Sequence, residues 1–126
     1  MHRIIICGSR TFTDFNMLTQ YLDNKFANED KSQITIVSGH ARGTDMLAES
    51  YAHMRNIHLR EFPAKWNTLG KSAGMVRNKD MLNYITQPGH TPEVIAFWDG
   101  ISRGTENMIQ IAKKANVPVD ICHFTI

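Results

Sequence analysis

The stretch "RIIICGSR" at residues 3–10 decides the fold of this chain. From its first isoleucine to its cysteine it is continuously apolar and rich in β-branched side chains, which predicts a strand buried on both faces. A glycine ends this strand. Two later runs, "QITIV" at 33–37 and "EVIAFW" at 93–98, have the same character. Strands that are apolar on both faces are typical of a parallel sheet covered by helices on each side.

Helical segments alternate with strands along the whole chain. The patterns predict helices at residues 13–27, 44–55, 71–85 and 104–115, and two further strands at 57–62 and 117–124. This alternation predicts an α/β fold, a three-layer sandwich with a mostly parallel five-stranded sheet. Because the chain has only 126 residues, we expect residues 1–126 to form a single domain. Sheets of this kind bind ligands at the carboxyl ends of their strands.

The composition is that of an ordinary globular protein with little net charge. Fourteen Lys and Arg residues against 12 Asp and Glu give a formal net charge of +2. Nucleic-acid-binding proteins usually concentrate basic residues on one face, whereas this chain has a small net charge and no run of lysines or arginines. A nucleic-acid partner is therefore not expected. No apolar run reaches the ~20 residues of a membrane span, and the first residues do not resemble a signal peptide. We therefore expect a cytoplasmic protein with no membrane partner, whose two cysteines are free thiols.

Two loops repeat one pattern of residues. "SGHARGTD" at 38–45 and "DGISRGTE" at 99–106 both read x-G-x-x-R-G-T-acid, and each follows an apolar strand. Glycines let a ligand approach backbone amides, helix N-termini attract anions, and arginine forms paired hydrogen bonds with phosphate. The repeat therefore predicts two phosphate-binding turns at one edge of the sheet, with Thr44 and Thr105 capping the helices that follow. The alternative is that both are simple turns whose arginines, Arg42 and Arg103, point to solvent.

Several further residues share the expected edge of the sheet. Phosphate contacts are expected from Arg10 in the first loop, from Arg77 and Asn78 in "GMVRN", and from Lys65 in "PAKW". Trp66 in the same segment could stack on a base. His40 could contact the ligand or act as an acid, while the histidine spacing predicts no metal site. No dinucleotide or ATPase fingerprint is present, so no cofactor is expected. The predicted ligand-binding residues are Gly8, Ser9, Arg10, Ser38, Gly39, Arg42, Gly43, Thr44, Asp45, Lys65, Trp66, Arg77, Asn78, Asp99, Gly100, Ser102, Arg103, Gly104 and Thr105.

Five segments together resemble a known family. "GSRTF" (8–12), "SGHARGTD" (38–45), "FPAKW" (62–66), "AGMVRNKDM" (73–81) and "IAFWDGISRGTENMI" (95–109) resemble the small, stand-alone SLOG-superfamily proteins related to YspA and YpsA. The resemblance implies a Rossmann-like fold, a nucleotide or nucleotide-derived ligand similar to ADP-ribose, and a homo-oligomer. The superfamily also includes the Lonely Guy phosphoribohydrolases and DNA-processing protein A.

The resemblance to the Lonely Guy enzymes bears on catalysis. By that resemblance Arg77 matches a motif arginine, and residues 99–105 match a glycine-rich loop with one extra residue. The position of the glutamate used in N-glycosidic hydrolysis is occupied here by Met108. A displaced carboxylate, that of Glu106, Asp45 or Asp99, would have to replace it, and Glu106 is the candidate in the expected catalytic pair with Arg77. We expect a nucleotide-binding protein that acts as a sensor or sequesters its ligand. The alternatives are a hydrolase acting on a nucleoside monophosphate or nucleotide signal and, more weakly, a single-stranded DNA-binding protein.

Overall fold

Five parallel strands form the centre of the molecule. The computed structural model describes residues 1–125 and contains the strands β1 (His2–Gly8), β2 (Ile34–Ser38), β3 (His58–Glu61), β4 (Thr91–Trp98) and β5 (Val119–His123). Their order in the sheet is β3-β2-β1-β4-β5, and all four pairings are parallel. The predicted α/β, Rossmann-like fold is confirmed, with a sheet that is entirely parallel.

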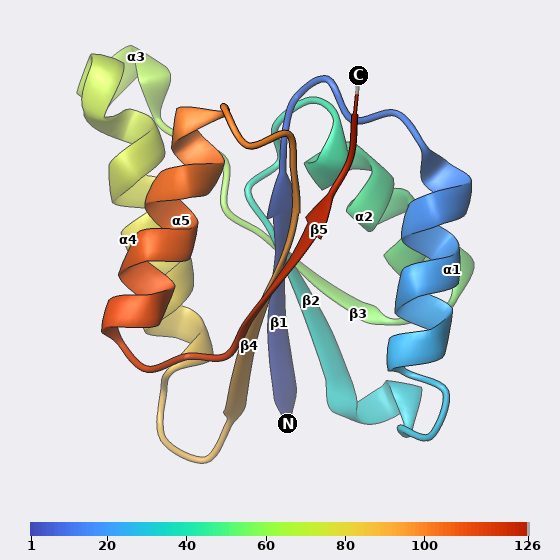
Figure 1. The fold of residues 1–126 in the computed structure, drawn as a ribbon. Coiled ribbons are helices and arrows are strands. Elements are labelled where there is room, and N and C mark those ends of the chain that lie inside the picture. Colours follow the sequence, from blue (N-terminus) through green and yellow to red (C-terminus); the bar gives the residue numbers. More distant parts are fainter. Residues whose placement is uncertain (126) are drawn as a thin grey trace.

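Helices cover both faces of this sheet, as Figure 1 shows. The helices α1 (Phe15–Lys25) and α2 (Thr44–Met54) lie on one face, and α4 (Ala73–Ile85) and α5 (Arg103–Lys114) lie on the other. The short helix α3 (Trp66–Leu69) and the 3₁₀ turns η1 (Lys31–Gln33) and η2 (Gly70–Ser72) complete the elements. The helices expected from the sequence do not include α3. Among the described residues, no helix combines the length and apolarity that a membrane span requires.

The apolar run of β1 explains why the sheet needs both layers. Successive side chains of a strand point to opposite faces. Ile4 and Ile6 are therefore buried against α1 and α2, whereas Ile5 and Cys7 are buried against α4 and α5. Each of the three isoleucines is fully buried. A continuously apolar strand thus joins two separate cores.

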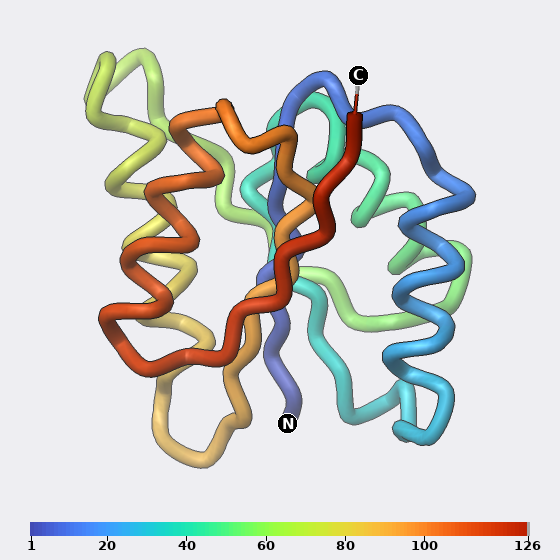
Figure 2. Tube along the Cα trace, in the orientation of Figure 1, coloured from blue at the N-terminus to red at the C-terminus, as the bar shows by residue number. Residues whose placement is uncertain are grey.

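The carboxyl edge of the sheet gathers the loops that follow three strands. β1 lies at the centre of the strand order, and the chain places β2 and β3 on one side of it and β4 and β5 on the other. The loops after β1, β2 and β4 meet at the upper edge in Figure 2. The loops after β1 and β4 therefore leave the sheet toward opposite faces, at the point where the strand order switches sides. Folds of this kind form their ligand sites at that point of the carboxyl edge.

Candidate functional site

A cavity of about 290 Å³ opens at the carboxyl edge of the sheet. Its walls come from the end of β1 and the loop after it, from the loop before α2 and the start of that helix, from the second and third turns of α4, and from Ser102 and the first turns of α5. The predicted residues that line it are Gly8, Arg10, Asp45, Arg77, Asn78, Ser102, Arg103, Gly104 and Thr105. Nine of the 19 predicted residues are thus brought to one hollow by four separate segments of the chain.

A second hollow of about 290 Å³ adjoins the first. Three arginines, Arg10, Arg77 and Arg103, line both hollows. The second one adds Lys71 and Trp66, and the indole of Trp66 is half exposed. The combined site is therefore basic, with an aromatic ring at one side.

Arg77 is the best-anchored of the three arginines. Its Nη1 donates to the carbonyl oxygen of Gly39 at 2.5 Å, and its Nε donates to Asn78 Oδ1 at 3.0 Å. The Asn78 amide in turn donates to the carbonyl oxygen of Gly104 at 3.1 Å, which links α4 to α5. A Cβ atom at Gly39 would overlap the guanidinium. Gly39 is thus needed for the close approach of Arg77, whereas the sequence predicts that it offers its amide to an anion.

The charge of the site is unbalanced. No carboxylate among the described residues forms an ion pair with Arg10, Arg77 or Arg103. Asp45 is the one described acidic residue that lines the first cavity, and its side chain is buried. Burial raises the pKa of Asp45 to about 6, although the Ala41 amide and the Arg77 guanidinium both oppose that rise. Even with Asp45 ionised, the cavity keeps an excess of positive charge.

A polar network ties the loop after β1 to the loop after β4. Asp99 Oδ1 accepts hydrogen bonds from the Ile101 and Ser102 amides, both at 2.8 Å, and these bonds lower the pKa of Asp99 to about 2. The Ser102 hydroxyl lies 3.0 Å from the Ser9 hydroxyl, which also accepts from the Asp99 amide at 3.1 Å. Ser9 and Asp99 are therefore occupied in shaping the loops, and neither lines the described cavities.

The two repeated motifs do not have the same structure. α2 begins at Thr44 after Gly43, which has φ of +75°, whereas α5 begins two motif positions earlier, at Arg103. Thr44 is fully buried and its hydroxyl donates to the Ser9 carbonyl oxygen at 3.0 Å. Thr105 is the third residue of α5 and lines the cavity. The prediction that both threonines cap their helices is therefore wrong.

The remaining predicted residues lie away from the cavity. Arg42 and Gly100 are exposed and line none of the described hollows, and Ser38 is buried with its hydroxyl directed at Glu49. Lys65 lines a different hollow, beside Phe62. Glu106, the tentative catalytic carboxylate, is exposed on α5 and does not line the cavity.

Some residues that line the two hollows are absent from the predicted set. Met81 and Met108 form the apolar part of the wall, together with the buried thiol of Cys7. Met81 follows Arg77 by four residues, so helical periodicity could have placed it on the same face of α4. Lys71 and Asn107 line the second hollow because α3, α4 and α5 pack together there, and only the packing reveals that.

Comparisons with known proteins give a family and a similar fold. A family model described as "YspA, cpYpsA-related SLOG family" matches residues 2–68, just over half of the chain. No curated protein matches. One similar solved structure is DNA processing protein A from Helicobacter pylori, studied for its single-stranded DNA binding mode. It is 18% identical with a TM-score of 0.61, and the match covers 95% of this chain but 64% of that chain. At this identity the likeness supports the fold.

Proposed function

The chain belongs to the YspA, cpYpsA-related SLOG family, and from this premise we propose that its arginine-lined cavity binds a phosphorylated, nucleotide-derived small molecule. The observation that carries the proposal is the set of three arginines, free of carboxylate partners among the described residues, around one cavity. Arg77 is partly buried, which is unfavourable for its charge, whereas Arg10 and Arg103 are exposed. A phosphate would supply a counter-charge and accept paired hydrogen bonds.

The positions of the groups suggest how such a ligand would lie. Arg77 is held by Gly39 and Asn78 and would act as a fixed anchor, while Arg103 stands at the N-terminus of α5, where the helix dipole also favours an anion. Trp66 borders the adjoining hollow and would stack on a base or other planar group. A ligand longer than one phosphate, such as a nucleoside diphosphate sugar similar to ADP-ribose, would span both hollows. The protein would then act as a sensor or sequester its ligand.

Location and assembly are further parts of this proposal. We infer a cytoplasmic protein that forms a homo-oligomer, and residues 1–126 would act as one domain. Exposed apolar side chains on α3 and α4, those of Leu69, Met75 and Val76, support association between chains, because such groupings favour protein contacts.

The repeated motif offers a matched pair of variants for the test. Arg103 and Arg42 occupy the same motif position, but only Arg103 lines the cavity. We expect Arg103→Ala to weaken binding of ADP-ribose, ADP or AMP by about 1.5–3 kcal/mol, the contribution of a charge-assisted hydrogen bond, or about 10- to 150-fold. Arg42→Ala should leave the affinity within about twofold, well under 1 kcal/mol. Isothermal titration calorimetry with the full chain measures both.

Two results would contradict the binding proposal. One is the absence of binding or thermal stabilisation by any phosphorylated member of the panel. The other is an equal loss of affinity in the Arg42→Ala and Arg103→Ala variants. Tight, strongly salt-dependent binding of single-stranded oligonucleotides would instead favour the role named for the Helicobacter pylori structure.

A second candidate function is hydrolysis of an N-glycosidic bond. The observation that favours it is Asp45, a buried carboxyl beside the cavity whose pKa of about 6 suits proton transfer near neutral pH. In this reading Arg77 would hold the phosphate and Asp45 would take the place of the glutamate that Met108 replaces. Release of free base from nucleoside monophosphates, abolished in Asp45→Asn but kept in Glu106→Gln, would support this function. Binding without base release would leave the first proposal alone.

A further inference from the structure

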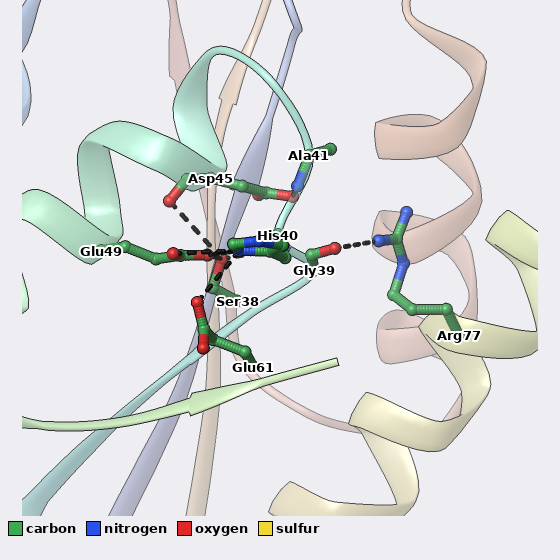
Figure 3. Close-up of polar contacts among 8 residues, drawn as sticks. All are labelled: Ser38, Gly39, His40, Ala41, Asp45, Glu49, Glu61 and Arg77. Atoms are coloured by element: carbon green, nitrogen blue, oxygen red, sulfur yellow. Dashed lines mark hydrogen bonds and ion pairs between the residues drawn. The ribbon is translucent and has the colours of Figure 1, made fainter. Parts of the chain in front are cut away.

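A second cluster of chemically active side chains lies outside the cavity. His40 in the loop after β2, Glu49 in the middle of α2 and Glu61 at the end of β3 point toward one another (Figure 3). The Nδ1 atom of His40 lies 2.9 Å from Glu49 Oε2 and 3.0 Å from Glu61 Oε2. One potential ligand atom from each residue lies within 4.8 Å of the other two. Three separate elements thus converge on one point.

The charge of this cluster is poorly balanced. Two carboxylates stand side by side, and among the described residues the imidazole of His40 is the one cationic group within ion-pair distance of them. Glu49 is buried, so solvent screens its charge weakly. Close carboxylates with a single histidine between them are a favourable setting for a bound divalent cation, because the ion would remove their mutual repulsion.

The spacing of the ligand atoms also fits a metal ion. Transition ions bind imidazole nitrogen and carboxylate oxygen at roughly 2.0–2.2 Å, so neighbouring ligand atoms of an octahedral site lie about 3.0 Å apart. The separations from His40 Nδ1 to the two carboxylates are 2.9 and 3.0 Å. These two separations match such a site, and the Glu49 and Glu61 oxygens lie within 4.8 Å of each other.

A supporting shell orients the buried ligand. The Ser38 hydroxyl donates to Glu49 Oε2 at 2.8 Å and accepts from the His40 amide at 3.1 Å. Outer hydrogen bonds of this kind hold metal-binding carboxylates in place. The exposed side chains of His40 and Glu61 leave room for water molecules to complete the coordination.

We propose that His40 Nδ1, Glu49 and Glu61 form a binding site for a divalent first-row transition ion, such as Zn²⁺ or Mn²⁺. The imidazole ligand favours these ions over Mg²⁺ and Ca²⁺, which prefer oxygen alone. On binding, Nδ1 gives its proton to the solvent and its lone pair to the ion. None of the three residues lines the arginine cavity, so this site is separate from the proposed anion site.

Calorimetric titration of the untagged, metal-free full chain with ZnCl₂ and MnCl₂ at pH 7.5 tests the proposal. We expect one ion per chain with micromolar affinity, and proton release seen as a heat that depends on the buffer. Mg²⁺ and Ca²⁺ should bind far more weakly. A Kd for both Zn²⁺ and Mn²⁺ above about 1 mM, equivalent to only ~4 kcal/mol, would overturn it.

Variants identify the ligands. His40→Gln and Glu61→Gln, both at exposed positions, should each weaken Zn²⁺ binding by about tenfold or more. His58→Gln is the control: His58 is an exposed imidazole three residues before Glu61 on β3, so it points to the opposite side of the strand. Equal losses in His58→Gln and His40→Gln would contradict the site. The affinity of the His40→Gln variant for ADP-ribose is measured alongside. Loss of Zn²⁺ binding with ADP-ribose binding kept would concern the metal site alone, whereas absence of ADP-ribose binding in the parent chain would concern the proposed function.

Discussion

Asp45 is the residue in which burial and charge oppose each other most directly. Its carboxyl is 7% exposed, and burial raises its pKa from 3.8 to about 6, with Glu49 adding to the rise and Arg77 and His40 opposing it. Between those two pH values the unfolded chain ionises Asp45 while the folded chain keeps it protonated, so this group lowers stability progressively as the pH rises from about 4 to about 6. We expect Asp45→Asn to increase the free energy of unfolding at pH 7.5 by about 1–3 kcal/mol and to leave it almost unchanged at pH 4. Urea unfolding at both pH values measures this. A variant that is less stable than the parent chain at pH 7.5 would show that the Asp45 carboxylate is stabilising in the fold.

The starts of α2 and α5 show how one motif can be used in two ways. Gly43 precedes α2 with φ of +75°, and a Cβ atom there would lie 2.5–2.6 Å from the carbonyl groups of Ser9 and Arg10. Gly104 lies in the first turn of α5, where an added Cβ would meet no atom within 4 Å. We therefore expect Gly43→Ala to lower the free energy of unfolding by about 2–4 kcal/mol, from backbone strain and overlap. Gly104→Ala should raise it by up to about 1 kcal/mol, because alanine favours the helix. Chemical denaturation without ligand measures both, and effects of the same sign would contradict the different geometry of the two turns.

Across the whole molecule, the two ends of the sheet have separate roles. The carboxyl edge carries the cavity, whereas the amino edge carries an ionic network in which Glu93 contacts His2 and Lys25, and Lys25 also contacts Asp120 at 3.0 Å. This network joins β1, β4 and β5 to the end of α1. We expect Glu93→Gln to lower the free energy of unfolding by about 1–3 kcal/mol, since a buried charged partner is lost. The affinity for ADP-ribose should stay within about twofold, well under 1 kcal/mol. Denaturation and calorimetry together measure this separation, and a large loss of affinity would mean that the two edges are coupled.

The two repeated loops show that a shared sequence pattern does not specify where its arginine lies in the fold. Both place an arginine after a strand, and from the pattern Arg42 and Arg103 are equivalent. In the fold, α5 starts at Arg103 just after the turn closed by Asp99, whereas α2 starts later, after the crowded backbone at Gly43. Both arginines are exposed, but only Arg103 lines the cavity. These outcomes depend on contacts with Ser9 in the loop after β1, which is 35 residues from Thr44 and 90 residues from Asp99, and no local spacing encodes such contacts.

The sequence by itself determined the class of fold, because the apolar run at Ile4–Cys7 and the alternation of strands and helices are local patterns with one stable layered arrangement. It also predicted that Arg10 and Arg103 share one edge of the sheet, because the loops after parallel strands lie on the same side. Only the tertiary structure decided that Asp45 is buried beside them and that His40, Glu49 and Glu61 meet. Burial and convergence arise when separate elements pack, so the physical properties of these side chains, charge and pKa above all, are set by neighbours that are distant in sequence.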